Sequence, residues 1–331
     1  MNYEKYAIVD LHLHLDGSLS PEIIIEIAKE ENIELPTYNP IELRSYLQVP
    51  NECDSLVEYL KRFDIPNYVL QTKNGLRKCM LDLLKRLSKQ GIKYAEIRMA
   101  PQLSTAKGLT QDEVVKTLID ASLEARKLFG IKSNLIVCMM RFENNNKENM
   151  ETVKVARKYL NKGVCLLDIA GAEALYPVSK YAELFMFANE LGVPFTIHSG
   201  EDTGYQSVVE SLKFGPVRIG HGVHSYQSEE LMKYLAENKI PLEICPKSNM
   251  DTKAIKSFKE LPVELFLSKG ILVTINTDDM TVSNTNLKNE YRILAEELGL
   301  NDEKLLQIAV NSINASRLSN EEKRELIDSL I

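Results

Sequence analysis

The chain has 331 residues, of which 44% are hydrophobic and 26% are charged, and its formal net charge is −7. This composition is typical of a soluble globular protein, and a net negative charge without any basic run argues against a nucleic-acid-binding surface. No apolar stretch is long enough to span a bilayer, and the first residues lack a signal-peptide pattern, so we expect a cytoplasmic protein without membrane contact.

Residues 7–15, Ala-Ile-Val-Asp-Leu-His-Leu-His-Leu, are predicted to form the first strand. The alternation puts His12 and His14 on one face and the leucines on the other. Two imidazoles on one strand face can chelate a single metal ion. The chain has only five histidines, so we interpret these two as ligands rather than as partly exposed strand residues.

The segment after this strand is predicted to be mainly helical. Asp16-Gly17-Ser18 read as a turn, and Ser20 followed by Pro21 is typical of a helix N-cap and first helical position. Further helices are predicted at residues 55–63 and 76–90. We therefore expect a helical lid insertion at about residues 18–90, at one rim of the fold.

Seven more strands are predicted, at residues 91–101, 133–141, 164–170, 193–197, 216–222, 240–245 and 271–276. Helices are predicted at about 110–129, 147–161, 179–191 and 228–238, and more fill the tail from about residue 286. Eight alternating units favour a closed α/β fold, the (β/α)8 TIM barrel. The alternative, a doubly wound open sheet, usually has fewer strands and often a Gly-rich nucleotide turn that this chain lacks. No linker or repeat is visible, so we expect one domain over residues 1–331.

Ionisable residues gather at the carboxyl ends of the predicted strands, which meet at one mouth in such a barrel. They are His12, His14, His198, Glu201, His221, Asp278 and Asp279. Three histidines and an aspartate suit zinc as ligands. Considered alone, the Asp278-Asp279 pair would be interpreted as a turn or helix cap, and His221 as a structural residue. Their position at strand ends is what supports a role in the site. The five cysteines are far apart without a Cys-x-x-Cys pair and indicate neither a disulfide framework nor a thiolate zinc site.

Taken together, these segments resemble the motifs of the adenosine deaminase family, within the metal-dependent amidohydrolase superfamily. The matching segments are Leu-His-Leu-His-Leu-Asp-Gly-Ser at 11–18, Tyr-Ala-Glu-Ile-Arg-Met-Ala-Pro at 94–101, Asp-Ile-Ala-Gly at 168–171, His-Ser-Gly-Glu at 198–201, Arg-Ile-Gly-His-Gly at 218–222, Cys-Pro-Lys-Ser-Asn at 245–249 and Asn-Thr-Asp-Asp at 276–279. They follow the family's order and span nearly the whole chain, so the set is specific although each motif alone is not.

The resemblance implies one Zn²⁺ per chain, with His12, His14, His198 and Asp278 as ligands and His14 also beside the substrate. It implies that Glu201 protonates the purine N1, and that His221 and Asp278 orient and deprotonate the attacking water. Asp279 would contact N7, the Gly171 backbone N–H would contact N3, and Asp16 would contact the ribose 5′-hydroxyl. Such proton donation requires at least one carboxyl group with a raised pKa.

The family's helical lid has three bulky apolar positions, which fall here on Leu56, Tyr59 and Phe63, and Tyr59 replaces a commoner phenylalanine. The packing of an amphipathic helix explains these three residues equally well.

Asp16 bears on the choice of substrate. A carboxylate can accept a hydrogen bond from a 5′-hydroxyl but repels a 5′-phosphate, which argues against AMP; capping of the following turn is its other possible role. The adenine-specific branch usually has glutamate at this position. We therefore expect hydrolytic deamination of adenosine and 2′-deoxyadenosine to the inosine products and ammonia, in purine salvage, with adenine deaminase as the alternative.

Other classes fit less well. An inactive binding barrel is disfavoured because Glu201 and all four ligands are intact, and a two-metal cyclic-amide hydrolase because no lysine ends the fourth strand. The cytidine-deaminase type is excluded because Pro-Cys-x-x-Cys is missing. The expected partner is a small purine nucleoside, and the expected state is a monomer or weak homo-oligomer.

Overall fold

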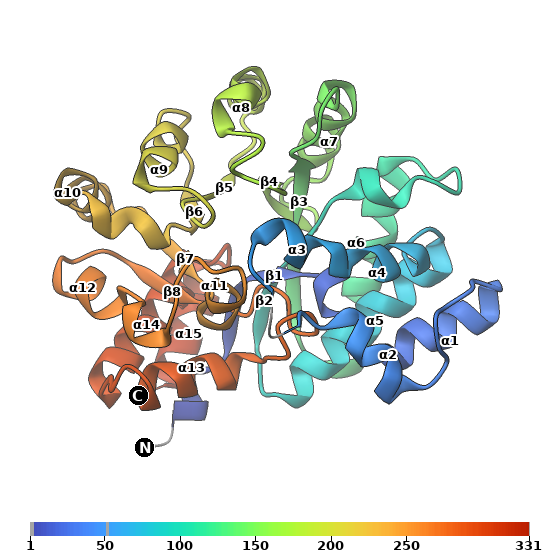
Figure 1. Cartoon of the computed structure of the whole chain (residues 1–331), viewed down its shortest axis with the longest axis horizontal. Helices are drawn as coiled ribbons and strands as arrows, with labels where there is room; N and C mark the ends of the chain where they lie inside the picture. Colours follow the sequence, from blue (N-terminus) through green and yellow to red (C-terminus); the bar gives the residue numbers. More distant parts are fainter. Residues whose placement is uncertain (1–2, 51–52, 331) are drawn as a thin grey trace.

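Eight short segments form parallel strands, and helices surround them to complete a (β/α)8 barrel, which confirms the predicted fold class (Figure 1). The structure is a computed structural model that describes residues 3–50 and 53–330; residues 51 and 52 of the predicted insertion, and residues 1, 2 and 331, lie outside the described part. The strands are β1 Val9–His14, β2 Tyr94–Met99, β3 Lys132–Met140, β4 Val164–Ala170, β5 Thr196–Ser199, β6 Arg218–His221, β7 Leu242–Ile244 and β8 Val273–Ile275.

Strands β1 to β4 form one parallel sheet in chain order, and β5 to β8 form a second. Backbone hydrogen bonds join the two sheets at both seams. The Leu167 N–H donates to the Pro194 carbonyl at 3.0 Å, and at the other seam the His14 N–H donates to the Asp278 carbonyl at 2.8 Å while the Asp278 N–H donates to the His12 carbonyl at 2.7 Å. The second seam therefore puts Asp278 directly beside the two histidines of β1.

The helices are α1 Pro21–Glu31, α2 Pro40–Leu47, α3 Leu56–Leu60, α4 Asp64–Val69, α5 Lys73–Lys89, α6 Gln111–Phe129, α7 Asn146–Tyr159, α8 Ala182–Glu190, α9 Tyr205–Leu212, α10 Glu229–Glu237, α11 Pro246–Asp251, α12 Val263–Ser268, α13 Leu287–Glu296, α14 Asp302–Ala315 and α15 Asn320–Asp328. Helix α1 begins as its sequence predicts: Ser20 accepts a hydrogen bond from the Ile23 N–H, and Pro21 occupies the first turn. No helix among the described residues combines the length and apolar character that a membrane crossing needs.

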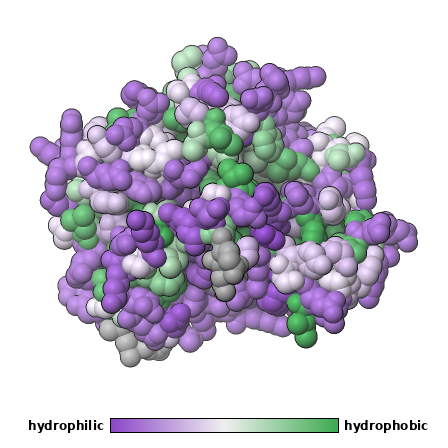
Figure 2. Space-filling model, in the orientation of Figure 1, coloured by the Kyte–Doolittle hydropathy of each residue, from purple (hydrophilic) through white to green (hydrophobic). Residues whose placement is uncertain are grey.

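Helices α1 to α5 lie between β1 and β2, in the region of the predicted insertion, and α3 lies in front of the barrel in Figure 1. The predicted helix at 55–63 divides into α3 and a 3-10 turn over Lys61–Phe63. A small apolar cluster of Cys53, Leu56, Tyr59 and Val282 joins α3 to the loop after β8. In the same orientation, Figure 2 shows a largely hydrophilic face on which hydrophobic residues gather near α3.

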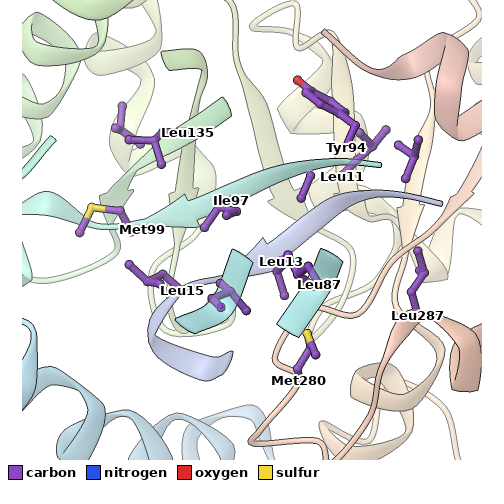
Figure 3. Packing of buried hydrophobic residues seen from close by; sticks show 14 of the residues in the cluster. Leu11, Leu13, Leu15, Leu87, Tyr94, Ile97, Met99, Leu135, Met280 and Leu287 are labelled. Atoms are coloured by element: carbon purple, nitrogen blue, oxygen red, sulfur yellow. The ribbon is translucent and has the colours of Figure 1, made fainter. Parts of the chain in front are cut away.

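The leucines in and just after β1 face the helices rather than the barrel axis. Leu11, Leu13 and Leu15 belong to the main apolar cluster, together with Ile97 of β2 and Leu87 of α5 (Figure 3). Because side chains alternate along a strand, the intervening residues of β1 face the barrel interior. This register points both histidines of β1 inward.

The barrel interior also holds a buried ionic network, formed by Glu96, Arg98, Asp168, Arg218 and Glu243, each at most 1% exposed. Arg98 pairs with Asp168 at 2.9 Å, Arg218 pairs with Glu96 at 2.5 Å, and both arginines pair with Glu243. Each of these charges has at least one partner of opposite sign, which is the condition for burying ions, although three carboxylates face only two arginines.

Two predictions from the sequence differ from the structure. The pattern predicts the fifth strand at 193–197, whereas β5 is Thr196–Ser199, so His198 lies within it. Pro194 has no N–H to donate to a ladder, although its carbonyl accepts the seam bond. Helices α9, α11 and α12 are absent from the prediction, because six to eight residues give too few turns for a helical period to be visible.

Candidate metal and substrate site

Four side chains converge at the mouth of the barrel: His12, His14, His198 and Asp278. One ligand atom from each lies within 4.8 Å of the others. The His198 Nε2 lies 3.0 Å from the His12 Nε2 and 3.2 Å from the His14 Nε2. The Asp278 Oδ1 lies 3.3 Å from the His12 Nε2 and 3.5 Å from the His14 Nε2. These segments are far apart in sequence, and the strand ends bring them together.

This donor set fits a tetrahedral cation. Three imidazole nitrogens and a carboxylate oxygen that face one another cannot all be satisfied by protons. With zinc–nitrogen bonds of about 2.0–2.1 Å, the edge of a coordination tetrahedron is about 3.3 Å. The observed ligand–ligand distances of 3.0 to 3.5 Å lie around this value.

Two members of the buried ionic network orient these histidines. The Glu243 Oε2 lies 2.9 Å from the His12 Nδ1, and the Asp168 Oδ2 lies 2.8 Å from the His198 Nδ1. A carboxylate on Nδ1 leaves Nε2 free to bind a metal and fixes the ring orientation. Sequence reasoning assigns Glu243 and Asp168 no role; the available signal was a lone acidic residue inside each of two apolar strands.

Glu201 lies on the loop after β5 and is 6% exposed. Its Oε2 lies 3.4 Å from the His221 Nε2, and the Thr252 hydroxyl donates to its Oε1 at 3.0 Å. Burial, and secondarily the charge of Asp278, raises the pKa of Glu201 well above its ordinary value. Glu201 therefore meets the expectation that at least one carboxyl group here has a raised pKa.

The loop that carries Glu201 is held by a residue that sequence reasoning missed. The Glu173 carboxylate accepts hydrogen bonds from the backbone N–H groups of Gly200, Glu201 and Asp202, at 2.7, 3.2 and 3.2 Å. Three donors on one buried carboxylate fix the backbone from which the Glu201 side chain projects.

His221, the last residue of β6, and Asp278, three residues after the end of β8, both lie in the left-handed backbone region, with φ of 58° and 59°. Non-glycine residues adopt this region at a cost, and such positions cluster at functional sites. The Cys245 N–H donates to the Asn249 Oδ1 at 3.2 Å, so the Asn249 amide nitrogen is the group that faces the His221 Nδ1 at 3.0 Å. The Nδ1 therefore accepts, and the Nε2 of the neutral imidazole carries the proton.

The ionisation of these two residues differs. Burial lowers the pKa of His221 well below its ordinary value, so the ring is neutral. Burial opposes ionisation of Asp278, but the facing imidazoles, His12 first, hold its pKa well below the usual range. The Ser248 hydroxyl also donates to the Asp278 Oδ2 at 2.7 Å. The site thus combines an ionised aspartate with a neutral histidine.

A cavity of about 490 Å³ opens beside the cluster, and every sequence-predicted site residue except His12, which is buried, contributes to its wall: His14, Asp16, Leu56, Tyr59, Phe63, Gly171, His198, Glu201, His221, Asp278 and Asp279. The wall also includes residues for which no role was predicted, among them Arg141, Met140 and Tyr176.

Asp16, Gly171 and Asp279 each show a distinct environment in this wall. The Asp16 Oδ1 accepts the Gly17 N–H at 3.2 Å, so the capping contact that was its alternative role is present, and burial raises its pKa to about 6. Gly171 has a φ of 111°, a conformation that other residues rarely adopt. Burial, and then the charge of Asp278, raises the pKa of Asp279 well above its ordinary value.

Known proteins match this chain over almost its full length. A family model described as adenosine deaminase matches residues 8–331. An adenosine deaminase from Haemophilus ducreyi is 45% identical over 329 residues, which cover 98% of this chain and 95% of that protein, and one from Clostridium botulinum is 41% identical, covering 98% of each. Among solved structures, an adenine deaminase from Arthrobacter aurescens is 26% identical with a TM-score of 0.87, covering 98% of this chain and 97% of that one.

Proposed function

The chain belongs to the adenosine deaminase family, and from this premise we propose that its site hydrolyses adenosine and 2′-deoxyadenosine to inosine, 2′-deoxyinosine and ammonia. The observation that carries the proposal is the meeting, in one cavity, of a four-donor metal cluster and a buried acid with a raised pKa. Nucleophilic attack on a purine needs both an activated water and a proton for the ring.

We infer that the resident metal is zinc, held by His12, His14, His198 and Asp278. Borderline nitrogen ligands with one carboxylate, at tetrahedral spacing, support this identity. When bound there, zinc would lower the pKa of a water ligand to about 7 and so supply a nucleophile at neutral pH. The remaining steps depend on side chains of this chain.

Glu201 is proposed as the proton donor to the purine N1. Its raised pKa favours the protonated form of the carboxyl group, and the Thr252 hydroxyl donates to its Oε1. Protonation of N1 withdraws electrons from C6, which makes that carbon open to attack by water. N1 keeps this proton in the inosine product. The proton that the base Asp278 takes from the attacking water would pass to the amino group, which leaves as ammonia, and the remaining proton of the water oxygen would restore the Glu201 acid.

Asp278 is proposed as the base that takes a proton from the attacking water, because it is the ionised group of the pair. His221 is proposed to orient the water rather than to deprotonate it. Its Nδ1 faces the Asn249 amide, so its Nε2–H, which lies 3.4 Å from Glu201 and 3.8 Å from Asp278, donates hydrogen bonds into the site. This assignment narrows the shared role that the family resemblance implied for the two residues.

The carboxyl group of Asp279, in its protonated form, is proposed to donate a hydrogen bond to N7 of the purine. The Gly171 N–H is proposed to donate to N3, and Asp16 to accept from the ribose 5′-hydroxyl. The walls contributed by Leu56, Tyr59 and Phe63 would cover the ligand on the lid side, so the partner is a small purine nucleoside. Because the fold is also shared with an adenine deaminase, the free base is the second candidate. Asp16 favours the nucleoside, since a free base has no hydroxyl to donate to this half-buried carboxyl group.

An ultraviolet absorbance assay of deamination tests the proposal. It is run in parallel with adenosine, 2′-deoxyadenosine, adenine and AMP. We expect turnover of the two nucleosides, a kcat/KM for adenine that is lower by about a hundredfold or more, and none for AMP. If adenine were the best substrate, adenine deamination would replace adenosine deamination as the proposed function. If none of the four compounds released ammonia, both functions would be rejected.

Glu201→Gln separates the proton donor from the metal site. A glutamine side chain cannot donate an acidic proton, so we expect kcat to fall by about 10² to 10⁴-fold while zinc content stays unchanged. Activity within tenfold of the wild type would remove Glu201 as the donor.

A further inference from the structure

Tyr59 makes a hydrogen bond that links the lid to the purine-facing wall. It lies on α3 and is 2% exposed. Its hydroxyl donates to the Asp279 Oδ2 at 3.0 Å and lies 2.9 Å from the Ser283 hydroxyl. Since a phenol has one proton, donation to Asp279 leaves Ser283 as the donor to the Tyr59 oxygen. The three groups form a directed chain from Ser283 through Tyr59 to Asp279.

The Asp279 carboxyl group is confined on two sides. Tyr59 engages one oxygen, while the other, Oδ1, is buried and has no hydrogen-bond partner among the described residues. A Cβ at Gly17 would lie 1.7 Å from this Oδ1, so the carboxyl group packs against the bare backbone of residue 17. A buried polar atom without a partner is costly unless a ligand satisfies it.

The loop that carries Asp279 is fixed independently of Tyr59. The Thr281 N–H donates to the Gly17 carbonyl at 3.0 Å, and the Met280 N–H donates to the Ser18 hydroxyl, also at 3.0 Å. Loss of the Tyr59 hydroxyl would therefore free the carboxyl group to rotate without moving its backbone.

We propose that Tyr59 is a positioning residue: its hydroxyl donates to the Asp279 Oδ2 and holds the carboxyl group so that the partnerless Oδ1, carrying the acid proton, donates a hydrogen bond to N7 of the purine. This role rests on the proposed function. Through Tyr59, helix α3 would help to recognise the purine as well as cover it. A purely structural tyrosine would anchor the lid through its ring, and its hydroxyl would have no effect that depends on the ligand's position 7.

Two ligands isolate the N7 contact. 1-Deazaadenosine and 1,7-dideazaadenosine both lack N1, so Glu201 has no ring nitrogen to protonate and neither should react; they differ only in nitrogen or C–H at position 7. Direct calorimetric titration of the zinc-loaded protein measures their affinities without turnover. For Tyr59→Phe we expect about tenfold weaker binding of 1-deazaadenosine and less than twofold change for the dideaza compound.

Val282→Ala is the matched control, because it trims the same apolar cluster but keeps the hydroxyl chain. We expect it to weaken both ligands by the same factor. Ser283→Ala removes the donor to Tyr59. It should also weaken the binding of 1-deazaadenosine selectively, but by a smaller factor than Tyr59→Phe does. With adenosine, Tyr59→Phe should raise KM and change kcat by less than twofold, since the Tyr59 hydroxyl contacts Asp279 and Ser283 and neither Glu201 nor a metal ligand.

Equal changes for the two ligands in Tyr59→Phe, or no change for either, would overturn the positioning role. Failure of the proposed function is a separate result: the wild-type protein would then release no ammonia from adenosine, whatever the two titrations give.

Discussion

Glu290 offers the clearest link between a buried group and measurable stability. It lies on α13 and is fully buried, and its Oε2 accepts the Lys247 N–H at 2.9 Å while the Thr285 hydroxyl donates to Oε1. It thereby holds the start of α11, the helix whose Ser248 and Asn249 contact the site. Burial raises the pKa of Glu290 from 4.5 to about 8.

The folded and unfolded states differ in the protonation of Glu290, and this makes stability depend on pH. At neutral pH the folded protein keeps the carboxyl group protonated, whereas the unfolded chain releases the proton. The stability contribution is complete below pH 4.5 and is lost as the pH rises through about 8. At 1.36 kcal/mol per pKa unit, the free energy of unfolding falls by about 2.5 kcal/mol between pH 6 and pH 9 through this group alone.

Glu290→Gln removes the titration but keeps an amide oxygen for the Lys247 N–H. Urea unfolding of both proteins at pH 6 and pH 9 gives the difference in unfolding free energy at each pH. We expect the free energy of unfolding of the variant, relative to that of the wild type, to be about 2.5 kcal/mol higher at pH 9 than at pH 6. Glu297→Gln, an exposed site just after the same helix, controls for the loss of one negative charge. A difference that is equal at both pH values would refute the reasoning.

Three further predictions concern the site. Chelation should abolish turnover, and added zinc should restore it. His198→Ala should lower the zinc content measured by atomic absorption, whereas His224→Ala, at a histidine outside the four-donor cluster, should keep it. Full zinc occupancy in His198→Ala would show that His198 is not a ligand. Asp16→Ala should lower kcat/KM for adenosine by about 10 to 100-fold and for adenine much less, because it deletes a charged hydrogen-bond acceptor; equal losses would leave only the capping role. Gly17→Ala should push Asp279 aside and lower kcat/KM by about tenfold or more with zinc content unchanged, and normal kinetics would contradict the close packing of residue 17 against that carboxyl group.

Much of the fold followed from local patterns in the sequence. Helices were predictable between most of the eight strands, so the order of the strands and the barrel could be predicted, and the strand ends then located the chemically active residues. His12 and His14 were recognisable because alternation puts both on one face of a strand. The short helices α9, α11 and α12 carried no such periodicity and were missed.

Contacts between distant residues could not be predicted in the same way. Asp168 and Glu243 sit in apolar strands, and nothing local distinguishes an inward acidic residue that pairs with arginine from an outward one that meets water. The bond between Tyr59 and Asp279 joins residues 220 positions apart and depends on how α3 rests on the loop after β8. Glu173 likewise acts on a loop that follows the next strand.

The ionic network inside the barrel has a consequence for how the protein matures. Arg98, Asp168 and Glu243 are paired with one another as soon as the strands close, and they already hold the rings of His12 and His198. Ion pairs within the protein thus orient these two rings, whereas small domains that fold only around their zinc rely on the metal itself. We therefore expect chains to complete the barrel first and to acquire the metal afterwards, so that a shortage of the ion would limit activity rather than the yield of folded protein.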